Sequence, residues 1–303
     1  MDIPIVLIIY RRPDTTAQVL AALRPLRPAR LFVVADGPHP DRPADQARVT
    51  ATRDLIERIE WPCRVDRIYA EVNMGLRRRV ESGLHAVFDQ VERAVILEDD
   101  CIADPHWFRF AQELLDRYVA APSVGLISGM NPDLRRRRPE SASYFFSRYT
   151  FCWGWATWRR AWQHYDGAMA DWPQLRDSGW LETQLRDRRA VRFWRRVFDA
   201  VYAGAVDSWA YRWTYSCWRA GMLGAVPVVN MVSNVGFGNQ ATHTTAAHSP
   251  FAARPRSAPA FPLRHPPAVV VDRRRDDYFQ RTLYDPRLPT RILWRLQRLL
   301  RRS

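Results

Sequence analysis

Lysine is absent from this sequence of 303 residues, so all 46 of its basic side chains are arginines. They outnumber 32 acidic residues and give a formal net charge of +14. A charge of this size attracts anions, and the candidates are nucleotide phosphates, acidic glycans, an anionic membrane surface and nucleic acid. Composition therefore narrows the chemistry of the partner without identifying it.

Cysteine is scarce, and the four cysteines are scattered along the chain at Cys63, Cys101, Cys152 and Cys217. No two of them have the CxxC spacing, so neither a zinc ribbon nor a disulfide framework is indicated. We expect reduced, mostly buried thiols in a cytosolic protein.

Long apolar runs are missing as well. The short run near the N-terminus, in "MDIPIVLIIYRRPD", has no basic stretch before it and no small-residue cleavage site after it, so we do not expect a secretory signal. No run reaches the length that crosses a bilayer. We therefore expect a cytoplasmic protein, and its 13 tryptophans argue against disorder.

The first third of the chain shows a regular alternation of strands and helices. Strands are predicted at 3–10, 31–37, 63–70 and 94–100, and the first of them is a continuous apolar run. Helices are predicted between them, the first capped by Asp14 or Thr15 and the second spanning 44–59. This order implies an α/β fold with a mostly parallel central sheet and helices on both faces.

Three carboxylates, Glu98, Asp99 and Asp100, follow the strand predicted to lie at the centre of the sheet. In such sheets ligands bind beyond the carboxyl ends of the strands. Partly desolvated carboxylates held this close repel one another unless a cation or hydrogen-bond donors compensate them. A solvated loop would have the same residues, but the central position favours a site for a divalent metal and a nucleotide.

The stretch "VILEDDC" resembles the DxD-type signature of GT-A glycosyltransferases, which bind a nucleotide-sugar through a divalent metal. Its Glu-Asp-Asp form is similar to that of N-acetylglucosaminyltransferase I-like enzymes. Other stretches are similar to bacterial family-2-type relatives, namely "PIVLIIYRRPDTTAQVLAAL", "VVADGP", "NMGLRRRVESGLHAVF", "CWGWATWRRAW", "DSWAYRW" and "SNVGFGNQATHT". The resemblance implies a GT-A-like fold, Mn²⁺ or Mg²⁺ as cofactor and a nucleotide-sugar donor.

The resemblance also implies roles for the strand-end acids. Asp100 would bind the metal, Asp99 would lie near the ribose, and Glu98 would lie near the donor sugar among the catalytic residues. Asp36 would accept a hydrogen bond from the nucleotide base. Asp before Gly is also common in turns, which is the alternative for Asp36.

Two residues of "NMGLRRR" are candidates for binding the donor. Asn73 suits a tight turn, and Arg77 lies at a helix N-terminus, where a diphosphate is favoured. The alternative is an ordinary turn followed by solvated arginines.

Two later residues complete the predicted site. Asp207 precedes an aromatic helix, and we weigh a helix cap against the catalytic base of an inverting transferase. His243 follows two glycines in a loop that we expect to close over the donor, and the resemblance implies that it completes the metal coordination. The aromatic stretch 144–162 is expected to be mostly core, with one or two rings facing substrate.

We therefore predict a GT-A-like domain over 1–270, with a nucleotide-binding half at 1–101 and an acceptor half and closing loop at 102–270. A basic amphipathic extension follows at 271–303, and it either binds the inner face of an anionic membrane or docks on the enzyme itself.

The predicted activity is transfer of a sugar to a glycan, lipid-linked or protein acceptor. One alternative is a sugar nucleotidyltransferase, which usually has a Gly-rich loop where this chain has "YRRPDTT". A nucleic-acid-binding protein is the other. We do not expect nucleic acid as a partner, because the three acids would repel its phosphates.

Overall fold

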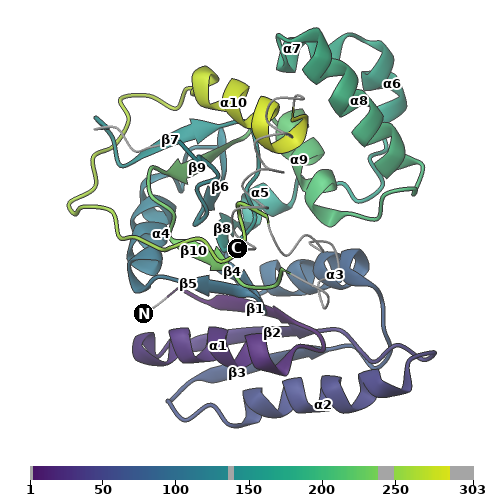
Figure 1. The fold of residues 1–303 in the computed structure, drawn as a ribbon, viewed down its shortest axis with the longest axis vertical. Helices are drawn as coiled ribbons and strands as arrows, with labels where there is room; N and C mark the ends of the chain where they lie inside the picture. Colours follow the sequence, from purple (N-terminus) through teal and green to yellow (C-terminus); the bar gives the residue numbers. More distant parts are fainter. Residues whose placement is uncertain (1–2, 136–139, 238–248, 287–303) are drawn as a thin grey trace, which may run out of the picture.

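The computed structural model describes residues 3–135, 140–237 and 249–286. An eight-stranded sheet in the order β3-β2-β1-β4-β8-β6-β9-β7 forms its centre (Figure 1). Its strands are β1 Ile5–Ile9, β2 Arg30–Ala35, β3 Arg64–Tyr69, β4 Arg93–Glu98, β6 Val124–Ser128, β7 Tyr144–Ser147, β8 Trp155–Trp158 and β9 Leu223–Pro227.

Most strands of the sheet run in one direction. β3, β2, β1 and β4 are parallel neighbours, and β6 pairs with β9 in parallel. β8 is antiparallel to β4 and to β6, and β7 is antiparallel to β9. The predicted mostly parallel sheet is therefore confirmed, with β7 and β8 as the reversed strands.

A second, two-stranded sheet joins distant parts of the chain. It pairs β5 (Cys101–Ala103) with β10 (Val232–Asn234) in antiparallel fashion. Because β5 begins just after the three acids, this pairing brings the segment after β10 to the end of β4.

The helices fill the connections between the strands. They are α1 Pro13–Leu23, α2 Pro43–Glu57, α3 Leu76–Phe88, α4 Pro105–Arg117, α5 Arg159–Trp162, α6 Trp172–Asp177, α7 Trp180–Gln184, α8 Arg188–Tyr202, α9 Trp209–Arg219 and α10 Arg273–Phe279. A 3₁₀ turn spans Arg24–Leu26, and a π-helical turn, Gln280–Tyr284, follows α10.

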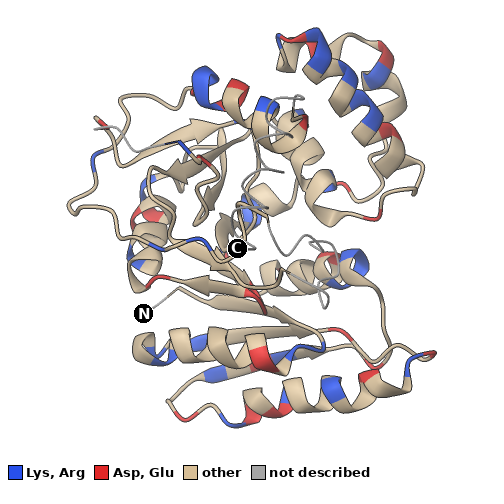
Figure 2. Cartoon of the chain, viewed as in Figure 1, with Lys and Arg blue, Asp and Glu red and all other residues tan. Residues whose placement is uncertain are grey.

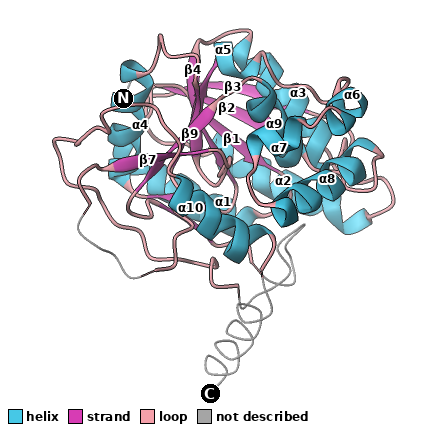
Figure 3. Ribbon diagram, turned by 90° about the horizontal axis from the view of Figure 1, so that it is seen from above, coloured by secondary structure: helices cyan, strands magenta, loops and turns pink. Residues whose placement is uncertain are grey.

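Alternating side chains of the buried strands supply two apolar cores, one on each face of the sheet. In β1, Ile5, Leu7 and Ile9 pack with α1, α2 and α4, whereas Val6 and Ile8 pack with α3, α5 and α9. Figure 3 shows the helices on both sides of the strands. A strand with this burial reads as a continuous apolar run, which is why its sequence predicted it correctly.

A third core is aromatic and lies among α6 to α10. Trp172, Trp194 and Tyr215 are almost fully buried in it. The predicted burial of the aromatic stretch is confirmed, because most of its rings are buried and only Trp153 is half-exposed. Aromatic side chains bury large areas, so they fill the space between these short helices.

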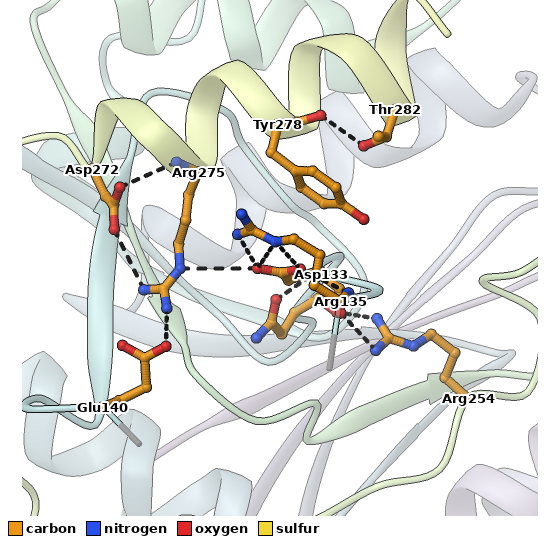
Figure 4. Close-up of polar contacts among 9 residues, drawn as sticks. Asp133, Arg135, Glu140, Arg254, Asp272, Arg275, Tyr278 and Thr282 are labelled. Carbon is orange, nitrogen blue, oxygen red and sulfur yellow. Dashed lines mark hydrogen bonds and ion pairs between the residues drawn. The ribbon is translucent and has the colours of Figure 1, made fainter. Parts of the chain in front are cut away.

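An ion-pair cluster, the α10 network, fixes α10 to the loop after β6 (Figure 4). Arg275 lies 3.5 Å from Asp272 and 4.0 Å from Asp133, and it also bonds to Glu140. Arg135 donates to both carboxylate oxygens of Asp133, at 2.8 and 3.1 Å. These five residues define the α10 network.

The start of α1 differs from the prediction. The helix begins at Pro13, with Arg12 in the N-cap position and no side-chain cap. Asp14 and Thr15 lie inside the first turn and do not cap the helix. Proline is well suited to the first helical position because its φ is already helical and its missing N–H is not needed there.

The beginning of the predicted C-terminal extension packs on the body of the protein. Phe279 is fully buried, and Gln280 accepts hydrogen bonds from Tyr149 and Trp194. The basic segment 287–303 lies outside the described residues. Among the residues that are described, none belongs to a helix both long and apolar enough to cross a bilayer.

Candidate functional site

Three groups of predicted site residues form at the carboxyl edge of the parallel strands and on the helices beside it. They are built around Asp100, Asp36 and Asp207. Each group joins segments that are far apart in the sequence.

The first group, the acid cluster, consists of Glu98, Asp99 and Asp100 together with Arg12. The Arg12 guanidinium donates to Asp100 Oδ2 at 2.8 Å and to Asp99 Oδ1 at 3.5 Å. The Tyr10 amide also donates to Asp99, at 3.4 Å. Because β1 and β4 are parallel neighbours, residues just beyond their ends meet, and the residues after β1 therefore face the acids.

Among the described residues, the acid cluster has more carboxylates than cations. Asp99 and Asp100 are each only 7% exposed, and Arg12 forms ion pairs with both of them. Burial raises the pKa of Glu98 to about 8, and repulsion by Asp100 and Asp99 adds to this. Burial and the charge of Asp100 likewise raise the pKa of Asp99 to about 7, although Arg12 acts in the opposite direction. A bound cation would relieve this repulsion.

The segment after β10 closes one side of the acid cluster. Asn234 Nδ2 donates to Asp100 Oδ1 at 3.0 Å, and the Val235 amide donates to the Asp100 carbonyl at 2.9 Å. A Cβ on Gly236 would lie 1.8 Å from Asp100 Oδ2, so only glycine fits there without displacing the segment. The glycine-containing loop thus begins in direct contact with the acid predicted to bind metal.

The second group is centred on Asp36, which follows β2. Its carboxylate accepts four hydrogen bonds, from the Gly37, Met74 and Gly75 amides and from Asn73 Nδ2, at 2.8 to 3.1 Å. A carboxylate has about four acceptor positions, so Asp36 is fully used in holding the turn before α3. Gly75 allows that turn, because its φ of 80° is left-handed.

The third group joins Arg77 on α3 to Asp207, just before α9. Arg77 Nε donates to Asp207, and its Nη1 bonds to Glu81 at 3.0 Å. Tyr165 donates to Glu81 at 2.6 Å and holds that carboxylate in place. Arg77 and Asp207, which were predicted separately for the site, are thus in contact. Arg77 forms ion pairs with two acids, Asp207 and Glu81.

Asp207 is not the cap of α9. Ser208 occupies the N-cap position, and its side chain accepts from the Tyr211 amide at 3.3 Å. The Asp207 side chain is 60% exposed. The structure therefore removes the capping interpretation and leaves this carboxylate accessible to a ligand.

Trp153 is the half-exposed ring of the aromatic stretch. It meets Phe237 edge-on, with ring centroids 5.5 Å apart, at the start of the loop after β10. This places an aromatic surface next to the segment that contacts Asp100, which suits the predicted contact between a ring and a substrate sugar.

His243 lies outside the described residues, so its predicted place in the metal coordination stays a prediction. Within the described part of the chain, no group of three or more His, Cys, Asp or Glu side chains is arranged to hold a metal ion. All four cysteines are free, with Cys101 and Cys217 buried.

Arg12 and Asn234 are the site residues that sequence reasoning did not select. The signal for Arg12 was its place after β1, beside the strand that ends in the three acids. Asn234 stood in a motif already chosen for its glycines, but the pairing of β5 with β10 that positions it has no local sequence signal.

No protein-family model and no curated protein matches the chain. Among solved structures, it is similar to mouse xyloside xylosyltransferase 1 in its apo form, at 10% identity and a TM-score of 0.37, over 72% of this chain and 81% of that one. It is also similar to a mannose-1-phosphate geranyltransferase from Thermus thermophilus, at 15% identity and a TM-score of 0.32, over 74% of this chain and 73% of that one. A UDP-glucose pyrophosphorylase in complex with UDP-glucose is 11% identical, with a TM-score of 0.28, over 50% of this chain and 64% of that one. At these TM-scores the likeness carries no argument about function.

Proposed function

We propose that this protein is a metal-dependent glycosyltransferase that moves a sugar from a nucleotide-sugar to a glycan, lipid-linked or protein acceptor, with inversion at the anomeric carbon. The supporting observation is the acid cluster, in which three carboxylates lie at the end of a central strand and Arg12 pairs with two of them. Its place in surface polysaccharide or glycoconjugate synthesis is part of the same proposal, as is the family resemblance of the "VILEDDC" stretch.

The residues of the acid cluster fit a divalent cation that is held partly by its ligand. Mg²⁺ and Mn²⁺ at nucleotide sites use one or two carboxylates together with phosphate oxygens, so a cage of three protein ligands is not required. Asp100 would hold the cation together with His243, and Asp99 would lie near the ribose of the donor. When bound, the cation neutralises the charge that develops on the diphosphate leaving group.

Arg12 has a defined part in this proposal. Its guanidinium lies on Asp100, which the cation would use, and on Asp99, so it offsets the repulsion between these carboxylates before the donor binds. Because arginine also binds phosphate through paired donors, it can pass from Asp100 to the diphosphate when the cation arrives. Arg12 thereby keeps the carboxylates in place and then positions the leaving group.

The remaining roles follow from contacts and exposure. Asp36 and Asn73 fix the shape of the turn before α3 through their hydrogen bonds. We propose that this turn contacts the nucleotide base and the donor. Glu98 would lie near the donor sugar. Asp207 would accept the proton of the acceptor hydroxyl, with Arg77 holding its carboxylate.

A screen of nucleotide-sugars tests the proposal directly. The melting temperature of the protein should rise with one nucleotide-sugar in Mn²⁺ and return to its original value with a chelator, because ligand binding to the folded state stabilises it. A set of UDP-, GDP-, CMP- and dTDP-sugars covers the common donors. No shift with any of them would contradict the proposal.

The nucleic-acid alternative predicts a different result. Retention on DNA that falls with salt, without metal-dependent nucleotide binding, would favour it. The nucleotidyltransferase alternative would appear as release of diphosphate from a nucleoside triphosphate and a sugar phosphate.

The cytoplasmic location and the attachment of residues 287–303 to the inner face of the membrane belong to the same proposal. Deleting residues 290–303 should reduce sedimentation with anionic vesicles, because each arginine near such a surface contributes about 1 kcal/mol. Equal sedimentation of the truncated chain would show that this segment has another purpose.

A further inference from the structure

The outer side of α8 carries a concentration of arginines that has no part in the site described above. Five of its fifteen residues are arginines, and Asp199 is its one acid. Figure 2 shows the basic residues as blue bands along this helix. Its opposite side is buried in the aromatic core through Trp194 and Phe198, so the helix cannot turn its arginines inward.

Three of these arginines form no ion pair with any described residue. Arg189 is paired with Asp285, and Arg195 with Glu182 at 3.2 Å. Arg188, Arg192 and Arg196 are exposed, and none of the ion pairs in the described part of the chain includes them. Outside the described residues the sequence has one acidic side chain, Asp2. The arginines of this surface therefore outnumber the acidic side chains that could pair with them.

The three unpaired arginines stand in one row, spaced four residues apart, and the row is about 12 Å long. Like charges at this spacing destabilise a helix slightly. The guanidinium groups of the row therefore repel one another, and a bound anionic partner would reduce this repulsion.

A hollow of about 490 Å³ lies beside the row. Its lining has four arginines and two carboxylates, namely Arg189, Arg192, Arg195, Arg196, Asp199 and Asp285. The hollow is large enough for a phosphate group, and its lining is rich in the donors that phosphate prefers. The row and the hollow together are called the α8 arginine surface.

Apolar side chains adjoin the arginines. Phe193 and Val197 continue the neighbouring row of the helix and are only partly buried, and Tyr202, at the end of α8, is 48% exposed. Basic side chains beside partly exposed aromatic and aliphatic ones are typical of helices that lie at a membrane surface. The sugar-phosphate backbone of duplex DNA would gain little from these apolar groups, whereas a bilayer would bury them.

We propose that the α8 arginine surface binds the phosphate groups of an anionic lipid bilayer. One lipid phosphate would occupy the hollow, and Arg188, Arg192 and Arg196 would contact phosphates along the row. This inference does not depend on the proposed transferase activity, because it uses no residue of the acid cluster.

Vesicle sedimentation with the full-length chain tests the inference. Wild-type protein should sediment with vesicles of equal parts phosphatidylcholine and phosphatidylglycerol, and much less with phosphatidylcholine alone. Replacing Arg188, Arg192 and Arg196 together by Gln should weaken binding about a hundredfold, since each arginine near an anionic surface is worth about fivefold. Replacing the same three by Lys should retain most of the binding.

A matched control removes the same charge elsewhere. Arg27, Arg42 and Arg58 are exposed and lie far from α8 in the sequence. Their joint replacement by Gln should weaken binding much less than the α8 triple variant. Circular dichroism melting of each variant verifies that it is folded.

Three results would overturn the inference. The first is an α8 triple Gln variant that binds vesicles as tightly as wild type. The second is a control triple variant that loses as much binding as the α8 variant does. The third is binding of DNA or soluble polyphosphate to the α8 arginine surface, at equal phosphate concentration, while the anionic vesicles do not bind.

Discussion

The acid cluster and the α10 network each gather three carboxylates, but they differ in the arginines that accompany them. Among the described residues, the α10 network has Arg135 and Arg275, whereas the acid cluster has Arg12. Burial raises the pKa of Asp133, yet its hydrogen bonds with Arg135 outweigh this and hold that pKa below its usual range. In the acid cluster the effect of burial is larger than that of Arg12, and the pKa of Glu98 rises to about 8.

The difference separates a cluster that holds the fold together from one suited to binding. Nearly balanced charges with good hydrogen bonds fix a loop to a helix. An excess of buried carboxylates costs stability, and it is expected where a cation or a cationic transition state is bound. The predictions below test this distinction.

The largest effect is expected for Asp100→Asn. This change keeps the shape of the side chain but removes the charge that would hold the cation, which is worth several kcal/mol in a transition state of this kind. Turnover of the donor should fall by about a thousandfold. The affinity for UDP or GDP in Mn²⁺ should fall to the value measured with a chelator.

The exposed Asp54→Asn is a control of equal charge, and it should leave both quantities unchanged. If Asp100→Asn binds nucleotide in Mn²⁺ as wild type does, the acid cluster is not a metal site.

Next in size is a pH effect at Asp276, a buried carboxylate that accepts hydrogen bonds from Ser147 and the Arg148 amide. Burial raises its pKa from 3.8 to about 7. Between these values the unfolded chain has lost this proton and the folded protein has kept it. The contribution of Asp276 to the free energy of unfolding is therefore greatest below pH 4 and should fall by about 4 kcal/mol as the pH rises to 7.

The measurement compares urea unfolding of wild type and Asp276→Asn across this pH range. The difference between them isolates Asp276 from the acid cluster, whose raised pKa values have the same sign. A difference that does not change with pH would contradict the prediction.

In the α10 network, Arg275→Met leaves three acids with one arginine. The Arg275 side chain is 14% exposed and also lies over the Phe145 ring, at 4.1 Å from its centroid. Loss of these buried ion pairs should lower the free energy of unfolding by about 3 kcal/mol. Nucleotide binding should persist below the melting temperature.

Its neighbour Arg274 is exposed and provides the matched control. Arg274→Met should change stability by less than about 0.5 kcal/mol. Equal losses from the two variants would mean that the α10 network does not stabilise the fold.

The smallest effect is expected at Asp207, a solvent-exposed carboxylate with one arginine partner. Asp207→Asn should reduce turnover by about a hundredfold, as for loss of a general base, and leave stability nearly unchanged. Ser208→Ala should do the reverse and cost about 1 kcal/mol of stability with turnover intact, because Ser208 is the cap. Wild-type turnover by Asp207→Asn would direct the search for the base to Glu98 or His243.

The sequence predicted correctly the elements that depend on residues close together in the chain. Continuous apolar runs identified β1, β2 and β4, and the acids after β4 followed from that assignment. Capping of α9 was one of two interpretations of Asp207, and the structure assigns the cap to Ser208; both residues are good caps, and the sequence alone does not choose between them. Arg12 and Asn234 were missed because contacts between distant segments, through β1–β4 and β5–β10, have no local signal.

The pairing of β5 with β10 also sets the order in which the site is completed during translation. The arginine after β1 and the acids at the end of β4 emerge from the ribosome early, because the chain is made from its N-terminus. Asn234 and Gly236 emerge only after the whole aromatic region has been made. A nascent chain that stops short of Val232 therefore contains the acid cluster but not the amide that donates to Asp100.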